Sequence, residues 1–345
     1  MEDAQMEARR IRWGILSTGM MACEKMVPAI ARSQFGDVVA IASRDADAAR
    51  MAAQNHGIAR FHDSYDSLIA DPEVDAIYNP LPTRMHVPVT LAAARAGKHV
   101  LCEKPIAMDS ADASLLAALR GSDVQVMEAF MIRHHPQWLL ARSLVRAGEL
   151  GPVRAIQSSF CYRNDDPVSG TNRAEDGGGA LLYVGCYPIV VGRFIFECEP
   201  LRILATSRYS DNFGTDTDTT GVADFGDGRH LSFHVSTATA RNQSVIIMGG
   251  EKHLSLTIPY NTPETEAVEV LVDGSGDLSG RYAERHVIPT ADHYALEADA
   301  LAKAVLGIEP LPYGIDDALA NMRALDAARL SARENRWVDI ENQLN

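Results

Sequence analysis

Positive charge is scarce in this sequence, and the shortage limits the partners that it can bind. The chain has 345 residues, with 32 Lys and Arg against 46 Asp and Glu, and its formal net charge is -14 at pH 7. Nucleic-acid binding needs clustered cations that displace counterions from phosphates. We therefore expect no nucleic-acid partner. A small anionic cofactor stays possible, because a helix N-terminus with a few local donors can bind phosphate.

Paired cysteines and metal-ligand motifs are also lacking. The five cysteines show no CxxC spacing, which fits neither a disulfide framework nor a zinc site. The neighbouring His134 and His135 have no third ligand at a suitable spacing. We expect no bound metal, and a reducing compartment, the cytoplasm, as the location.

No apolar run is long enough to predict a membrane span. The longest, residues 180–191, contains Gly185 and Pro188 and falls short of the roughly 20 residues that cross a bilayer. Residues 1–10 are polar, and no apolar segment of a secretory signal follows Arg9 and Arg10. We expect no membrane partner.

The sequence does contain a change of hydrophobic period near residue 130. Before it, short apolar runs alternate with helical segments, a pattern typical of a parallel sheet covered on both faces. We predict a doubly wound α/β domain over residues 1–130. Its predicted strands are residues 13–16, 38–43, 76–79, 99–102 and 125–127, and its predicted helices include residues 46–56, 92–96 and 109–119.

After a helix over residues 137–147, apolar and polar residues largely alternate. This pattern predicts antiparallel strands, with Asp227-Gly228 and Gly249-Gly250 as positive-φ residues of tight hairpins. Residues 131–345 are therefore predicted to form an α+β domain on a large, open, mainly antiparallel sheet. The predicted strands are residues 153–162, 203–207, 219–225, 230–236, 244–248 and 254–258, and the closing helices are residues 292–305 and 315–332.

A glycine-containing turn follows the first predicted strand and opens a helix. Ser17, Gly19 and Ala22 occupy the three glycine positions of a GxGxxG motif, whose backbone N–H groups bind a dinucleotide pyrophosphate in Rossmann domains. The imperfect motif has an alternative reading, a plain turn that needs Gly19 for its backbone angle. The predicted cofactor contacts here are Ser17, Thr18, Gly19, Met20 and Met21.

The end of the second predicted strand indicates which dinucleotide binds. Ser43 and Arg44 stand where an acidic residue would hold the ribose of NAD. Because a guanidinium binds a 2′-phosphate well, we predict NADP, with Ser43 and Arg44 as contacts. A solvated Arg44 is the alternative. Asp45 could favour NAD, but it is better explained as the N-cap of the next helix.

Four further motifs are more specific in combination. Residues 97–105 read GKHVLCEKP, residues 79–82 read NPLP, residues 127–131 read MEAFM and residues 177–181 read GGGAL. Together they resemble the Gfo/Idh/MocA family of oxidoreductases, named after glucose-fructose oxidoreductase and inositol dehydrogenase. The segments WGILSTG and ASR around the predicted cofactor site resemble the branch of NADP-dependent D-xylose dehydrogenases and dimeric dihydrodiol dehydrogenases.

The resemblance implies an activity and an assembly. The implied enzyme transfers a hydride between NADP(H) and a CH–OH or C=O group of a sugar, cyclic polyol or related small carbonyl compound. Two alternatives stay open, a trans-dihydrodiol or dicarbonyl reductase and a catalytically silent NADP-binding protein. The resemblance also implies a homodimer or homotetramer formed through the open sheet.

Lys104 is the predicted proton-transfer group. Oxidation of an alcohol needs a base for the hydroxyl proton, and burial beside a cationic nicotinamide would lower the pKa of a lysine. The alternative is a surface pair between Lys104 and Glu103. By resemblance the loop at Asn79 follows the nicotinamide, and His86 either positions it or merely caps a helix. The remaining predicted cofactor contacts are Asn79, Pro80, Leu81, His86, Glu103, Lys104 and Pro105.

Tyr183 and Tyr187 follow the glycine run. Family members commonly have an aspartate at the first position and a histidine or tyrosine at the second, and the spacing of four puts both on one helical face. By resemblance Tyr187 is the second catalytic group, and Tyr183 joins it and Lys104 around the substrate. Because Tyr183 replaces a carboxylate, we expect weak recognition of free polyols. The alternative for both tyrosines is that they are packed core aromatics.

Overall fold

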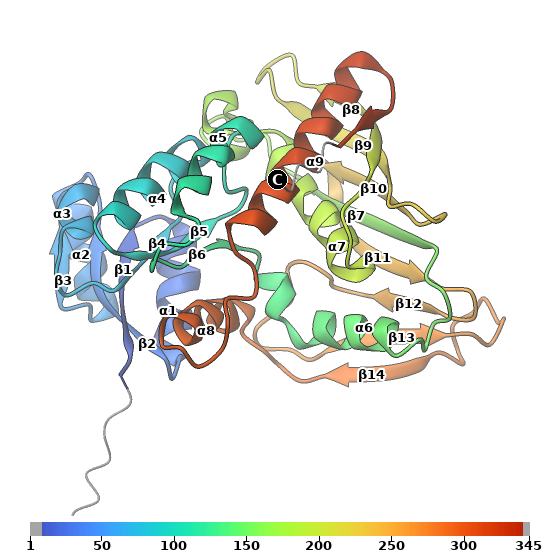
Figure 1. Ribbon diagram of the computed structural model, residues 1–345, viewed down its shortest axis with the longest axis horizontal. Helices are drawn as coiled ribbons and strands as arrows, with labels where there is room; N and C mark the ends of the chain where they lie inside the picture. Colours follow the sequence, from blue (N-terminus) through green and yellow to red (C-terminus); the bar gives the residue numbers. More distant parts are fainter. Residues whose placement is uncertain (1–8, 341–345) are drawn as a thin grey trace, which may run out of the picture.

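A computed structural model describes residues 9–340 and contains two sheets, each with its own helices (Figure 1). The outer ends of the two predicted domains, residues 1–8 and 341–345, lie outside the described residues. The first sheet has six parallel strands in the order β3-β2-β1-β4-β5-β6, so the predicted α/β fold is confirmed. Its strands are β1 (Ile11–Leu16), β2 (Gly36–Ala42), β3 (Arg60–His62), β4 (Ala76–Asn79), β5 (His99–Glu103) and β6 (Val126–Ala129).

The strand order determines where a ligand can bind. It reverses direction between β1 and β4, and in open parallel sheets the ligand crevice lies at the carboxyl ends of the strands beside such a reversal. Residues 17–21 follow β1, residues 80–82 follow β4, and Lys104 follows β5. All three predicted segments therefore meet at one edge of the sheet.

Helices cover this sheet on both faces (Figure 1). Two of them, α4 (His86–Arg95) and α5 (Ser110–Ser114), lie on one side, whereas α1 (Val27–Arg32) lies on the other and contacts α8 (His293–Val305). Because α8 comes from the end of the chain yet packs on the first unit, the predicted boundary at residue 130 stays a prediction. The remaining helices of this unit are α2 (Ala46–His56) and α3 (Tyr65–Ile69).

Asp45 acts as the predicted helix N-cap. Its Oδ1 accepts hydrogen bonds from the backbone N–H groups of Asp47 at 3.0 Å and Ala48 at 3.1 Å. The helix α2 ends at Gly57, whose φ is 66°. Two donors at the N-terminus and a left-handed residue at the C-terminus thus set the limits of α2, as the sequence predicts.

The second sheet is large and mainly antiparallel. Its order is β14-β13-β12-β11-β7-β10-β9-β8-β15, with one parallel pair, β7 and β10. Its strands are β7 (Ala155–Arg163), β8 (Arg202–Tyr209), β9 (Asp216–Asp224), β10 (His230–Ser236), β11 (Ala238–Met248), β12 (His253–Leu256), β13 (Val268–Asp273), β14 (Glu284–Ile288) and β15 (Val338–Asp339). The six predicted strands are present, and β13, β14 and β15 were not predicted.

Of the two predicted hairpin turns, one has the expected positive φ angles and the other does not. Asp227 and Gly228 have φ values of 52° and 73°, which confirms the first. Neither Gly249 nor Gly250 has a positive φ, so the second prediction is wrong. A Cβ at Gly249 would stand 2.0 Å from the carbonyl oxygen of Leu150, so close packing rather than backbone angle requires glycine there.

One face of the second sheet is covered by α6 (Pro136–Arg146), α7 (Cys186–Phe196) and α9 (Ile315–Glu334). The helical run that ends in α7 spans Ala174–Phe196, and by length and composition it could cross a membrane. However, 94% of its apolar window is buried inside the fold, so it packs as a core helix. Our expectation of a shorter run was wrong, because Gly185 and Pro188 lie within the helical run and do not end it.

Candidate active site

The turn after β1 has the geometry that a dinucleotide pyrophosphate needs. Ser17 adopts a φ of 75°, and its Oγ accepts a hydrogen bond from the backbone N–H of Gly19 at 3.1 Å. A π-helical segment, Met21–Met26, then leads into α1. Since the first N–H groups of a helix have no partner within it, they are available to phosphate oxygens. Ser17 thus bends the turn in place of the first glycine.

The residues that follow β2 are suited to bind the 2′-phosphate that distinguishes NADP from NAD. Arg44 is exposed, and within residues 9–340 no ion pair or hydrogen bond engages its guanidinium. The neighbouring acids are occupied, because Asp45 caps α2 and Asp47 pairs with Arg50 at 2.8 Å. Among the described residues, the two acids that follow Arg44 most closely are thus engaged by other groups, while the Arg44 guanidinium is free to hold a phosphate.

A pocket of about 540 Å³ lies between the two sheets, within the usual size range of small-molecule sites. It brings together nine of the predicted site residues: Met20, Met21, Pro80, Leu81, His86, Glu103, Lys104, Tyr183 and Tyr187. The other predicted residues lie outside its lining: Ser17, Thr18, Gly19, Ser43, Arg44, Asn79 and Pro105.

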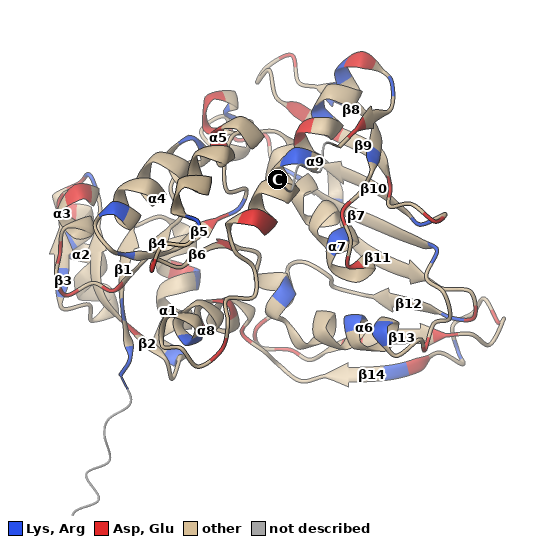
Figure 2. Ribbon diagram, viewed as in Figure 1, with Lys and Arg blue, Asp and Glu red and all other residues tan. Residues whose placement is uncertain are grey.

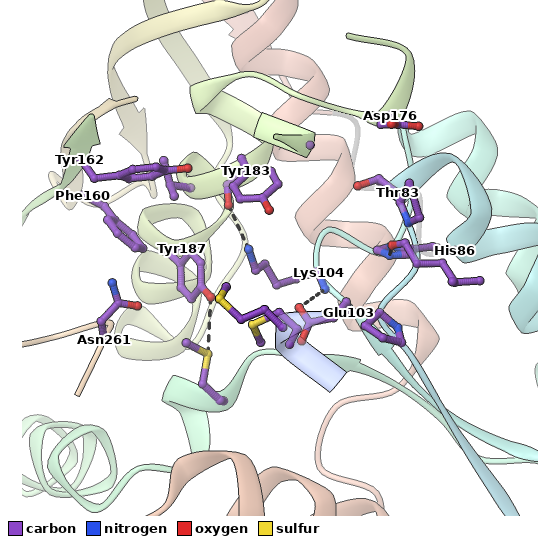
Figure 3. Close-up of a pocket in the computed structure, with 18 of the residues that line it drawn as sticks. Thr83, His86, Glu103, Lys104, Phe160, Tyr162, Asp176, Tyr183, Tyr187 and Asn261 are labelled. Atoms are coloured by element: carbon purple, nitrogen blue, oxygen red, sulfur yellow. Dashed lines mark hydrogen bonds between the residues drawn. The ribbon is translucent and has the colours of Figure 1, made fainter. Parts of the chain in front are cut away.

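Lys104 points into this pocket between the two tyrosines (Figure 3). Its Nζ donates a hydrogen bond to the carbonyl oxygen of Tyr183 at 3.1 Å and lies 4.9 Å from the ring centroid of Tyr183 and 5.0 Å from that of Tyr187. Glu103 accepts hydrogen bonds from the Lys104 backbone N–H at 3.2 Å and the Tyr78 hydroxyl at 2.7 Å. The alternative of a surface pair between Lys104 and Glu103 is therefore wrong. The peptide bond from Lys104 to Pro105 is cis.

The groups around Lys104 set its charge state. Burial lowers its pKa, but the combined interactions with Cys186, Glu103 and two tyrosines raise it, and the resulting pKa lies above its usual value. The protein's own groups thus favour the ammonium form. The predicted lowering applies to Lys104 beside an oxidised nicotinamide, and it stays a prediction for that complex.

Tyr187 belongs to the pocket lining but is almost fully buried. Its side chain is 4% exposed, and its hydroxyl donates to the sulfur of Met131 at 3.5 Å (Figure 3). Burial raises the pKa of Tyr187 well above its usual value, so the phenol stays protonated. Because a thioether is a weak acceptor, this hydroxyl can exchange it for a substrate oxygen. Tyr183 and Tyr187 share one helical face, as the spacing of four predicts.

The glycine run before these tyrosines has a structural cause. Asp216 of β9 accepts hydrogen bonds from the backbone N–H of Leu181 at 2.7 Å and from the Thr219 hydroxyl at 2.9 Å. A Cβ at Gly179 would stand 2.2 Å from Asp216 Oδ1. Only glycine lets this carboxylate cap the helix that carries Tyr183 and Tyr187. Sequence analysis missed Asp216, since nothing local connects β9 with that helix.

His86 ties two parts of the site together. Its Nδ1 lies 2.7 Å from the carbonyl oxygen of Pro105, and its Nε2 lies 2.6 Å from that of Leu81. Burial lowers the pKa of His86 to about 4. Asn79 is fully buried and donates to the His86 carbonyl oxygen at 3.3 Å. Asn79 thus supports the loop, and its predicted contact with the cofactor stays a prediction.

Several pocket residues were missed by the sequence analysis: Thr83, Phe160, Tyr162, Arg173, Asp176, Arg241, Gln243, Asn261 and Tyr294. Phe160 and Tyr162 stand two apart on a predicted strand, so alternation could have placed both on one face. Asp176 pairs with Arg173 at 3.1 Å, three residues before it, and with Arg84 at 2.6 Å; the second contact is distant in sequence, and no local pattern shows it. Within residues 9–340, no group of three or more His, Cys, Asp or Glu side chains is placed to bind a metal ion.

A parallel sheet whose first strand leads through a tight turn into a helix, joined to a mixed sheet across a pocket that holds a buried lysine, is the arrangement of a nicotinamide-dependent oxidoreductase. Family comparison agrees. Residues 11–130 match "Oxidoreductase family, NAD-binding Rossmann fold", and residues 138–255 match "GFO/IDH/MocA C-terminal domain". The chain belongs to the Gfo/Idh/MocA family.

Its relatives extend over nearly the whole chain. An uncharacterised oxidoreductase of Rhizobium meliloti is 42% identical, covering 96% of this chain and 99% of that protein. D-xylose 1-dehydrogenase (NADP+) of Haloferax volcanii is 33% identical, covering 95% and 99%. Trans-1,2-dihydrobenzene-1,2-diol dehydrogenase of Xenopus laevis is 34% identical over 68% and 72%. A 3-ketoreductase of Actinomadura kijaniata, crystallised with NADP and TDP-benzene, has a TM-score of 0.87 at 28% identity, covering 94% and 98%.

Proposed function

We propose that this NADP-dependent oxidoreductase acts on a CH–OH or C=O group of a sugar or related small carbonyl compound, with Lys104 as its proton-transfer group. The observation that carries the proposal is the position of Lys104 Nζ, in the pocket at the carboxyl end of β5 and 4.9 to 5.0 Å from two tyrosine rings. The xylose dehydrogenase and the ketoreductase among its relatives support the same chemistry.

In the reductive direction, Lys104 supplies the proton. When bound, the nicotinamide donates a hydride to the carbonyl carbon or accepts one from the alcohol carbon. As the carbon–hydrogen bond forms, the Lys104 ammonium passes a proton to the carbonyl oxygen, which yields the alcohol and a neutral amine. Because the pKa of Lys104 is raised, this proton is in place at neutral pH. The reverse reaction returns the hydroxyl proton to the amine.

The two tyrosines have different roles in this proposal. The hydroxyl of Tyr187, bound only to a weak sulfur acceptor, donates a hydrogen bond to the substrate oxygen beside Lys104. Tyr183 holds the lysine through its carbonyl oxygen and offers an aromatic surface to the substrate. By this proposal Lys104 and Tyr187 touch the reacting atoms, and His86 positions them from behind.

The aromatic wall favours a second candidate activity. Phe160, Tyr162, Tyr183 and Tyr187 all line the pocket, and a buried aromatic surface stabilises flat or sparsely hydroxylated compounds better than polyols. This observation favours a trans-dihydrodiol or dicarbonyl reductase. The Xenopus dihydrodiol dehydrogenase supports that alternative.

Turnover measurements separate these functions. NADPH oxidation would be followed with aldoses, dicarbonyls and aromatic aldehydes, and NADP+ reduction with trans-dihydrodiols and free sugars. We expect turnover in at least one set. NADPH binding without turnover of any compound would instead support a catalytically silent NADP-binding protein.

We also propose two domains, residues 1–130 and 131–345, and a homodimer or homotetramer formed through the uncovered face of the second sheet. That face presents short polar side chains such as Thr206, Thr220 and Ser159, which suit a second flat sheet. A cytoplasmic location is consistent with the five cysteines, all of which are free thiols. Light scattering that gives a monomeric mass would contradict the assembly.

A further inference from the structure

The pocket has a polar end made by residues that the proposed reaction does not use. Arg241 and Gln243 of β11 and Asn261, which follows β12, contribute to its lining. Figure 3 shows Asn261 beside Phe160 and Tyr187, on the opposite side of the pocket from His86 and Asp176. Gln243 Oε1 accepts a hydrogen bond from the backbone N–H of Asn261 at 3.1 Å, which leaves the Gln243 amide N–H groups as donors.

An irregularity of the sheet brings Arg241 to this end. In the pairing of β11 with β7, Ala238 stands opposite Arg163 and Asn242 opposite Cys161, so residues 239–241 face the single residue Tyr162. Tyr162 itself lines the pocket. A bulge of this kind re-aims side chains beside functional sites. Arg241 stands two residues before Gln243 and shares its face of the strand.

Arg241 is also available for a ligand. Among the described residues, none forms an ion pair or hydrogen bond with its guanidinium, although acidic residues outnumber basic ones in this chain by 46 to 32 and are interspersed along both units (Figure 2). The acids that line the pocket are occupied elsewhere, Glu103 by Tyr78 and Asp176 by two arginines. A guanidinium without a carboxylate, next to amide donors, is the arrangement that binds an oxyanion.

We propose that Arg241, with Gln243 and Asn261, binds a phosphate or carboxylate group that the substrate carries at a distance from its reacting carbon. The inference rests on the proposed function, since it assigns the far end of the same pocket. With the aromatic wall beside Lys104, it defines the substrate class as a hydroxy or carbonyl compound that has few hydroxyls at its reacting end and an anionic group at the other.

Matched ligands test this assignment. Isothermal titration calorimetry of the NADP+ complex would compare benzaldehyde with 4-formylbenzoate and 4-formylphenyl phosphate, and D-glucose with D-glucose 6-phosphate. We expect at least one anionic member to bind about tenfold or more tightly than its neutral partner, with the preference weakening as salt is added. The carboxylate and phosphate members distinguish which oxyanion the site prefers.

Two arginine variants identify the source of the preference. Arg241→Ala should remove the preference for the anionic member of each pair and leave the affinity for the neutral compounds unchanged. Arg208→Ala, at an exposed arginine of β8 outside this pocket, should keep it. Equal affinities within every pair, no binding of any anionic member, or a preference retained in Arg241→Ala would each overturn the inference.

The outcome can be separated from failure of the proposed function. Binding needs no hydride transfer, so a charge preference measured without turnover would support the anion site while contradicting the reaction. Turnover of neutral compounds with no charge preference would support the reaction while contradicting the anion site.

Discussion

Replacing Arg44 by alanine should remove the selectivity of the protein for NADP(H). Arg44 is exposed at the end of β2 and has no acidic partner among residues 9–340, while Asp45 and Asp47 are bound to α2 and Arg50. One charge-assisted contact between guanidinium and 2′-phosphate accounts for about tenfold in affinity, or ~1.4 kcal/mol, when the pair is open to solvent. We therefore expect NADPH to bind at least about tenfold tighter than NADH. In Arg44→Ala, the dissociation constants of the two cofactors should become similar.

Fluorescence titration with both cofactors measures this ratio. Because the pair is exposed, the ratio should also shrink as salt is added, since the Debye length falls from about 10 Å at 0.1 M to about 3 Å at 1 M. Arg50→Ala is the matched control, because Arg50 is another exposed arginine, on α2, but is already paired with Asp47. Equal dissociation constants in the natural protein, or a ratio that persists in Arg44→Ala, would refute the reasoning.

Two further changes test the site and the core. Tyr183→Asp restores a carboxylate at the pocket and should raise kcat/KM for aldoses such as xylose while lowering it for apolar diols and dicarbonyls; steady-state kinetics showing efficient aldose turnover by the natural protein, undiminished against the variant, would contradict this. Glu128 is buried, and its pKa is raised from 4.5 to about 8, so the stability that its protonated form contributes is complete below pH 4.5 and is lost as the pH rises through 8. The free energy of unfolding of Glu128→Gln should therefore rise relative to that of the natural protein as the pH increases through this range, by up to about 5 kcal/mol at about 1.4 kcal/mol for each pKa unit. Urea unfolding of both proteins measures this difference, and a difference that does not change with pH would show that Glu128 does not titrate there.

Local patterns predicted most of the fold. The cap at Asp45 works as expected, because its carboxylate accepts from N–H groups two and three residues ahead, and Asp109 and Asp292 cap their helices in the same way. Of the missed strands, β13 repeats valine at positions 268, 270 and 272, all buried, so its alternation was readable. The edge strand β14 contains Glu284, Arg285 and His286, and its apolar content is too low for a pattern to show.

The site was predicted where its residues belong to contiguous motifs. The loop at residues 80–82, the pair Glu103 and Lys104, and the two tyrosines line the same pocket, because strand order brings the carboxyl ends of β4 and β5 together. The pKa of Lys104 was not predictable, since it depends on burial and on Cys186, Tyr183 and Tyr162, which lie far from it in sequence.

Residues set by sheet register were also out of reach. Arg241 enters the pocket because three residues of β11 face one residue of β7, and no spacing in the sequence records a bulge of this kind. Asp216 caps a helix from a distant strand. Both depend on tertiary pairing, which local propensity does not encode.

Substitution of Lys104 tests the central claim most directly. Lys104→Met keeps a similar side-chain length and removes the proton, so NADPH binding measured by fluorescence should stay nearly unchanged. With a substrate that the natural protein turns over, kcat should fall by about two orders of magnitude or more, the range of a lost acid/base group. A variant that binds NADPH and retains the natural kcat would contradict the assignment of Lys104 as the proton-transfer group.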